Sequence, residues 1–322
     1  METPDLILPR ADEKVNEWAA KKRQAARVSR IMQKTRIPAY ERRGDLMSEC
    51  GNKLEFEYVN GRYKLASAWL CRDRLCPICA WRLAIKRTAE MLKMCKALHE
   101  IAPNTRALHI VLTVRSVHGE DLRPELQRIN AAFGRLRRRA LWREFILGYA
   151  RSIEVTYNPD RDTYHPHIHC IAIVKDTYRR QITMGDWVDL WRSCARLEYP
   201  PIVWAKYAYA NPARMDLEEY EYSQVTASAA IVEAMKYAVK PTDLMQAVNA
   251  GGIMELGDAL SGFRLVSFGG LLKKVRQDLG FTSDDEDPQL PECELDPAEA
   301  LDQYRVCYQW AAATSSYVRV TS

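Results

Sequence analysis

The order of hydrophobic and polar residues along the chain predicts a mixture of strands and helices. In residues 53–71, apolar and polar side chains alternate on both sides of an Asn-Gly pair. This is the pattern of a β-hairpin with a two-residue turn. Short apolar runs rich in β-branched residues predict further strands at 107–116, 149–158, 165–174 and 202–209. Helical spacing predicts helices at 12–35, 80–99, 123–144, 184–197 and 227–240, and a short final helix at 298–311. We therefore expect an α+β protein, in which the Pro-Asp-rich residues 159–164 join two strands as a hairpin.

The composition is typical of a water-soluble globular protein, with 47% hydrophobic and 28% charged residues. A run of about 18 apolar residues, which a membrane-spanning helix needs, is absent from the sequence. The first ten residues lack the basic and apolar regions of a signal peptide. We therefore expect a cytoplasmic protein with no membrane partner, whose nine cysteines are reduced thiols or metal ligands rather than disulfides.

Charge is distributed unevenly along the chain. The net charge is +5, yet nine acidic and only two basic side chains follow Gly280. The part before Gly280 is therefore strongly basic, which favours a polyanionic partner such as nucleic acid, with a well-mixed solvated surface as the alternative. The basic helix at 12–35 is either an arm on DNA or a solvated helix. The basic face of the helix at 123–144 carries candidate DNA-binding residues, namely Arg135, Arg137, Arg138 and Arg139.

Three of the six histidines occur within five residues, in the sequence YHPHIHCIAIV. Because side chains alternate along a strand, His165, His167 and His169 share one face. The adjoining strand offers Glu154 between two apolar residues, and pairing of the strands would bring its carboxylate beside the imidazoles. Two imidazoles and a carboxylate suit Mg²⁺ or Mn²⁺ with open positions for a phosphate oxygen. His165 is the weakest ligand candidate, because the following proline places it at the start of the strand.

The helix at 227–240 contains a candidate nucleophile. Glu233 and Tyr237 are four residues apart on one helical face, and Lys240 follows about one turn later. Attack by a tyrosine on a phosphodiester stores the bond energy in a phosphotyrosine and frees a 3′-hydroxyl. Lysine can neutralise the phosphate or the developing phenolate, while a metal polarises the scissile phosphate. This spacing is common in ordinary helices, so the interpretation depends on the histidine strand; Lys236 is a further candidate for DNA binding.

Three sequence runs, in this order, resemble the replication initiators of small rolling-circle plasmids: LTV (112–114), EVTYN with HPHIHCIAIV, and EAMKYAVKPTD. These initiators belong to the HUH endonucleases, in which a hydrophobic residue separates two histidines, as Ile168 does here. The resemblance covers roughly residues 50–280. It implies an antiparallel nuclease sheet with the tyrosine helix packed beside the metal. It also implies that Glu233, one turn before the tyrosine, activates water to end replication after one round.

Four cysteines form a candidate structural zinc site. Cys71, Cys76 and Cys79 lie in the sequence CRDRLCPIC, and Cys50 lies about twenty residues upstream, across the predicted hairpin. Four thiolates complete a closed tetrahedral zinc site. The related initiators carry a similar Cys-x-x-Arg-x-Cys-Pro-x-Cys element. Buried free thiols are the alternative interpretation.

We expect four regions along the chain. They are a basic helical arm at 1–45, a zinc-binding hairpin, knuckle and helix at 46–100, an HUH endonuclease domain with a central antiparallel sheet at 101–280, and an acidic linker and tail at 281–322.

The expected function is initiation of plasmid rolling-circle replication. The protein would bind origin DNA as a single strand or hairpin, nick it to give a 5′-phosphotyrosine adduct and a free 3′-hydroxyl primer, and work with the host helicase and polymerase. An HUH transposase or mobilisation relaxase is one alternative, although relaxases usually place the tyrosine before the histidines. A non-catalytic zinc-containing DNA-binding regulator is the other, and it would need neither the histidine strand nor the tyrosine helix.

Overall fold

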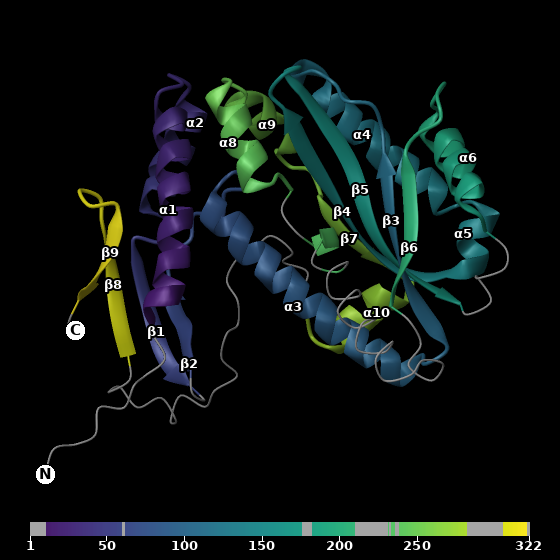
Figure 1. Cartoon of the computed structure of the whole chain (residues 1–322), viewed down its shortest axis with the longest axis horizontal. Coiled ribbons are helices and arrows are strands. Elements are labelled where there is room, and N and C mark those ends of the chain that lie inside the picture. Colours follow the sequence, from purple (N-terminus) through teal and green to yellow (C-terminus); the bar gives the residue numbers. More distant parts are fainter. Residues whose placement is uncertain are drawn as a thin grey trace, which may run out of the picture. The chain divides into compact units, whose positions relative to one another are not determined.

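The chain folds into two units, each with its own antiparallel sheet (Figure 1). The first unit combines residues 1–83 with 286–322, and the second comprises residues 84–285. The computed structural model describes residues 11–59, 62–175, 182–209, 231, 233–235, 238–281 and 305–320. Mixed helices and antiparallel sheets confirm the predicted α+β class.

The first unit begins with a pair of helices, α1 (Ala11–Gln33) and α2 (Pro38–Glu49). They approach closely at Gly44, where a Cβ atom would meet the carbonyl oxygen of Ser29 at 2.8 Å. Side chains spaced by three or four residues bury one face of α1: Val15, Trp18, Lys22, Ala25, Val28, Ser29 and Met32. One face of α1 therefore packs inside the unit, and whether its basic face contacts DNA or is solvated stays a prediction.

The sheet of the first unit joins the two ends of the chain. The predicted hairpin is present as β1 (Lys53–Val59) and β2 (Arg62–Ala68). From the C-terminal part come β8 (Arg305–Ala311) and β9 (Ser316–Val320), and the strand order is β2-β1-β8-β9. The helix expected at 298–311 is wrong over 305–311, because these residues instead form an antiparallel ladder with β1.

Among the described residues of the second unit, five antiparallel strands form one sheet in the order β6-β3-β5-β4-β7. These are β3 (Thr105–Thr113), β4 (Ile146–Asn158), β5 (Thr163–Lys175), β6 (Val203–Tyr209) and β7 (Val266–Gly269). The first four were predicted, and β4 and β5 form the predicted central hairpin. In its register Glu154 lies opposite His167, and Ser152 lies opposite His169. The residues opposite one another in such a ladder share a face of the sheet.

Helices of the second unit cover both faces of this sheet. The helices whose bounds lie in the described part of this unit are α3 (Pro77–Ile101, from Ala84 onward), α4 (Gly119–Leu136), α5 (Ala140–Phe145), α6 (Met184–Ala195), α8 (Pro241–Asn249), α9 (Ile253–Leu260) and α10 (Gly270–Asp278). Figure 1 shows α4, α5 and α6 on one face, where Phe133 and Trp142 pack on Tyr149. On the other face, α3 and α10 contribute Met91 and Leu272 to a core with strand residues. We call this second face the histidine face, because the residues described below lie on it.

The predicted helix at 123–144 is divided into α4 and α5 by residues 137–139. None of the described helices combines the length and the apolar character needed to cross a membrane.

Candidate metal centre

Three side chains with metal-ligand chemistry meet on the histidine face. Glu154 Oε2 lies 3.0 Å from His169 Nε2 and 3.4 Å from His167 Nε2. All three residues are buried, and one ligand atom from each lies within 4.8 Å of the others. The ring of His165 stacks on that of His167 at 5.3 Å between centroids, but His165 is outside this converging group. The structure thus brings together the three residues that strand alternation places on one face.

Hydrogen bonds turn the remaining nitrogens of both imidazoles toward Glu154. His167 Nδ1 lies 3.1 Å from the carbonyl oxygen of His165 and must donate to it, so Nε2 carries a lone pair when the ring is neutral. His169 Nδ1 lies 3.2 Å from His109 Nε2. Both Nε2 atoms therefore face one carboxylate oxygen, to which each donates when it carries a proton, and a bound cation would take the place of these protons. The donor set fits Mg²⁺ or Mn²⁺.

Lys240 balances the charge of this group. Its Nζ lies 3.0 Å from Glu154 Oε1 and 3.6 Å from Glu233 Oε1. Burial alone would raise the pKa of Glu154, but hydrogen bonds and charges of His167 and His169 lower that pKa well below its ordinary value. Burial alone would lower the pKa of Lys240, but the hydrogen bond to Glu154 raises it overall. At neutral pH Glu154 is therefore a carboxylate and Lys240 an ammonium.

The segment that carries Glu233 and Lys240 packs on β4. Residues 233–235 are helical, whereas Ala238 is not, and its carbonyl oxygen accepts a hydrogen bond from Val155 N at 2.8 Å. Lys240 has extended backbone and precedes α8, which begins at a proline. The expectation that Lys240 continues the tyrosine helix is therefore wrong; its side chain reaches the site from the start of α8. The predicted residues Lys236 and Tyr237 lie outside the described residues.

The four predicted cysteine ligands converge in the first unit. The Sγ atoms of Cys76 and Cys79 each lie 3.6 Å from that of Cys50, and Cys71 Sγ lies 3.6 Å from Cys79 Sγ. Four sulfurs at a Zn–S distance of about 2.3 Å form a tetrahedron with edges of about 3.8 Å. All four cysteines are free of disulfides, and burial raises the pKa of the Cys76 thiol. The spacing and chemistry of this group are compatible with a zinc site.

Lys22 of α1 supports the segment that carries Cys50. Its side chain is 1% exposed, and its Nζ donates to the carbonyl oxygens of Ser48 at 2.7 Å and of Cys50 at 2.8 Å. Burial lowers the pKa of Lys22, while the nearby cysteines oppose this effect. The basic N-terminal helix therefore directs a cation into the core of its own unit.

Comparisons with known proteins identify the family. Residues 62–318 match the family described as "Replication protein". The chain is 31% identical over 325 residues to the "Protein rep" of Bacillus amyloliquefaciens, across 95% of this chain and 94% of the relative. It is also 31% identical to the "Protein rep" of Lactiplantibacillus plantarum, across 83% of each chain. This chain belongs to the replication protein family. No solved structure matches it.

Membership in the replication protein family confirms the resemblance to plasmid replication initiators. A third relative, the "Protein rep" of a Bacillus species, is 32% identical across 79% of this chain and 85% of its own length. The family match includes the hairpin β1–β2 only from residue 62 onward, and it extends through the histidine strand to β9.

The predicted DNA-binding arginines of this replication protein lie at the end of α4, beside the sheet face that α4 and α6 cover. Arg135 donates to the carbonyl oxygen of Cys194 at 2.6 Å, and Arg137 donates to the hydroxyl of Tyr149 at 2.9 Å. Arg139 donates to α6 as well. These bonds tie α4 to its neighbours, and a role in DNA binding for Arg135, Arg137, Arg138 and Arg139 stays a prediction.

His109 is a member of the site that sequence reasoning missed. It lies on β3, and its ring stacks on that of His169 with 5.4 Å between centroids. Burial and the neighbouring His169 lower the pKa of His109 to about 4, so the ring is neutral at neutral pH and its Nε2 can accept a hydrogen bond from His169 Nδ1. Asp243, in the first turn of α8, was also missed; burial raises its pKa, and Lys240 opposes this. The only sequence signal for His109 was one histidine inside an apolar strand.

We expect His109→Leu to weaken Mn²⁺ binding by about tenfold to a hundredfold, because loss of the acceptor at Nε2 frees the ring of His169 to turn. His109→Gln should retain most of the affinity, since its side-chain carbonyl can accept the same hydrogen bond. Titration of bound Mn²⁺ by electron paramagnetic resonance measures both variants. Equal affinities of the leucine variant and the unmodified protein would contradict this role.

Proposed function

We propose that this replication protein nicks one strand of plasmid origin DNA through attack by Tyr237. The phenolic oxygen would form a bond to phosphorus, and the 3′ oxygen would leave and take up a proton, giving a 5′-phosphotyrosine and a 3′-hydroxyl primer. The observation that carries the proposal is the convergence of Glu154, His167 and His169 with Lys240. A purely structural cluster would not require three buried ligand groups facing one point.

The proposed roles follow from the contacts of each residue. His167, His169 and Glu154 would hold Mg²⁺ or Mn²⁺, with His165 at the margin of the site. Such a metal, when bound, polarises the scissile phosphate. Lys240 lies between two carboxylates. It would neutralise negative charge that develops on the phosphate or the phenolate.

Glu233 has a separate proposed role in termination. Attack by Tyr237 consumes the phenol, and a chain with one such tyrosine needs another acceptor to release the DNA. Glu233 is half-buried beside Lys240, so its carboxylate is accessible to water. It would activate a water molecule that hydrolyses the phosphotyrosine at the end of one replication round.

The proposed partners are origin DNA, as a single strand or hairpin, and the host helicase and polymerase, in the cytoplasm. Transposases and mobilisation relaxases of the HUH class share the chemistry, but the family match favours the initiator. A non-catalytic zinc-containing regulator would bind origin DNA without using the metal centre.

The proposed function is tested with labelled single-stranded DNA from the origin of the plasmid that encodes the protein. Incubation with Mn²⁺ should give a covalent protein–DNA adduct that survives on a denaturing gel, and a chelator should abolish it. His167→Ala should also abolish the adduct, whereas Arg143→Ala, on the exposed surface of α5, should not. Binding of the DNA without any adduct would favour the regulator instead.

Glu233→Ala is expected to retain the first cleavage but to accumulate the adduct, because only hydrolysis needs a general base in this scheme. Loss of a general base commonly slows a step by about 10²–10⁴-fold. A time course of adduct formation and decay measures the two steps separately.

Two outcomes would contradict this division of labour. If Glu233 only forms an ion pair with Lys240, the variant should nick and release DNA like the unmodified protein. Equal loss of both steps would instead assign Glu233 to the metal or phosphate site.

A further inference from the structure

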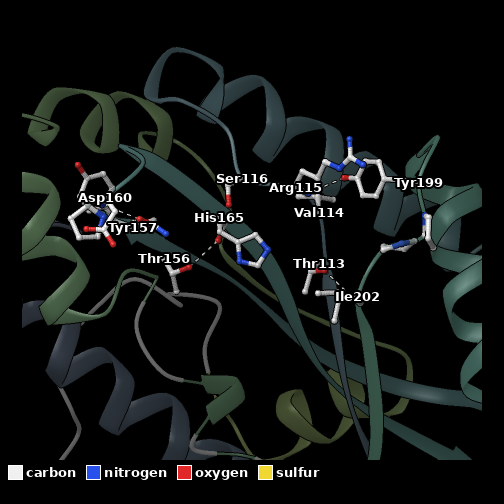
Figure 2. Close-up of a pocket in the computed structure, with 14 residues that line it drawn as sticks. Thr113, Val114, Arg115, Ser116, Thr156, Tyr157, Asp160, His165, Tyr199 and Ile202 are labelled. Atoms are coloured by element: carbon white, nitrogen blue, oxygen red, sulfur yellow. Dashed lines mark hydrogen bonds between the residues drawn. The ribbon is translucent and has the colours of Figure 1, made fainter.

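A cleft of about 720 Å³ opens at one end of the second unit's sheet (Figure 2). Its volume lies within the range of about 300–1,000 Å³ that is usual for ligand sites. The end of β3, the tip of the β4–β5 hairpin and the loop before β6 line it. Figure 2 shows His165 between the hairpin residues Tyr157 and Asp160 on one side and the pair Arg115 and Tyr199 on the other.

In the cleft, the guanidinium of Arg115 stacks on the ring of Tyr199. The guanidinium carbon of Arg115 lies 3.9 Å from the centre of the Tyr199 ring. The hydroxyl of Tyr199 accepts a hydrogen bond from Arg115 N at 2.8 Å, which fixes the ring against the end of β3. Arg115 is exposed and Tyr199 is half-buried. A planar cation on an aromatic ring presents a flat, positively charged surface to the cleft.

This surface is continuous with the metal centre. Thr113 lines the cleft, pairs with His167 across β3 and β5, and donates from Oγ1 to the carbonyl oxygen of Ile202 at 2.7 Å. Ile202, also in the lining, is 78% exposed. A chain of nucleotides held at His167 could therefore continue over Thr113 and Ile202 into the cleft.

A second pair of the same kind lies further along β6. Trp204 is 38% exposed, and Lys206 Nζ lies 5.4 Å from the centre of its ring. The ring of Trp204 also packs edge-on against His109, 5.1 Å between centroids. Cations alternating with aromatic rings along an open groove are typical of proteins that bind single-stranded nucleic acids, because every base has a face that can stack.

We propose that the cleft binds a nucleotide of single-stranded DNA next to the scissile phosphate, with its base on the Arg115–Tyr199 pair. This inference rests on the proposed function, since it takes the phosphate at the metal centre as the neighbouring one. The side chains of Ser116 and Asn158 also line the cleft and offer hydrogen-bonding groups to the edge of a base.

Affinity for a fluorescein-labelled, mixed-sequence single strand of about twelve nucleotides, measured by anisotropy, tests the cleft. Tyr199→Ala and Arg115→Ala should each weaken binding by about tenfold to a hundredfold, the range found for loss of one stacked base. Tyr199→Phe keeps the ring but loses the hydrogen bond from Arg115 N, so it should bind more tightly than Tyr199→Ala. Arg143→Ala removes an exposed arginine from α5, beside the opposite sheet face, and serves as the matched control for charge.

Photocross-linking gives a second, independent readout. The same single strand with 5-bromodeoxyuridine at each thymidine position should cross-link to Tyr199, as mapped by mass spectrometry. Cross-links confined to peptides outside the cleft would overturn the proposal. So would equal weakening by Tyr199→Phe and Tyr199→Ala, because the ring would then not be the stacking surface.

The adduct assay separates this inference from the proposed function. If the unmodified protein forms the adduct and both alanine variants bind DNA normally, the cleft assignment is wrong and the proposed chemistry stands. If no adduct forms but the alanine variants and the cross-link behave as expected, the cleft is a single-strand site and the proposed chemistry is wrong.

Discussion

Tyr237→Phe is expected to abolish strand cleavage and the covalent adduct while leaving the fold intact. The change removes only the phenolic oxygen, which is the attacking atom in the proposed reaction, and loss of a nucleophile commonly slows catalysis by more than about 10⁴-fold. The next residue, Ala238, is hydrogen-bonded to Val155, the neighbour of Glu154 on β4. Cleavage and adduct are measured on denaturing gels with labelled origin DNA and Mn²⁺, and the melting temperature checks the fold.

Tyr207→Phe is the matched control for this experiment. Tyr207 lies on β6, half-buried, with the guanidinium of Arg106 at 5.6 Å from its ring centre. Its hydroxyl should be dispensable for cleavage. An adduct retained in Tyr237→Phe would contradict the assignment, and peptide mapping would then identify the true nucleophile among the competitors Tyr207, Tyr209 and Tyr222.

Removal of zinc is expected to unfold the first unit. Structural zinc bound by thiolates contributes on the order of 10 kcal/mol to the folding of small metal domains, which is comparable to the whole stability of a typical domain. Around the cysteines, Leu75 and Ile78 are buried with Lys22, and all three would lose their fixed surroundings. Elemental analysis should find one zinc per chain in protein purified without chelator, and Cys76→Ser should lack it.

Hydrogen exchange locates the effect of zinc removal. Stripped protein should lose protection in α1, α2 and β1, while β3 to β5 of the second unit should retain theirs. Cys307→Ser is the matched control, because Cys307 belongs to the same unit but not to the converging cysteines. Protein that contains no zinc, or that keeps its protection after stripping, would reject the site.

The local sequence was sufficient to predict the strands that carry the candidate metal centre. Successive side chains of a strand point to opposite faces of the sheet. His167 and His169 must therefore share a face, and Glu154 must face away from the residues on either side of it. The short Pro-Asp-rich link then brings β4 and β5 together as a hairpin. The spacing of the cysteines was likewise a local signal for their convergence.

The C-terminal strands could not be assigned from their own residues. Val306 and Tyr308 are buried and have the spacing of a strand, but a short alternating run carries little information about its partner. Residues 305–309 become a strand because β1, far earlier in the sequence, offers them an antiparallel ladder. The burial of α1 could not be predicted for the same reason. Its apolar stripe is weak, and it is buried only because other elements of its unit pack against it.

The sequence by itself determined the faces of the strands, the type of ligand at each candidate site and the family resemblance, because these depend on residues close together in the chain. Only the tertiary structure decided that His109 supports His169, that Lys240 approaches Glu154 from the start of α8, and that the Arg115–Tyr199 pair lines a cleft beside the histidines. These contacts join residues far apart in sequence. These contacts depend on the order of the strands and on where the helices pack. Neither the propensity of single residues nor the alternation of apolar and polar residues predicts that arrangement.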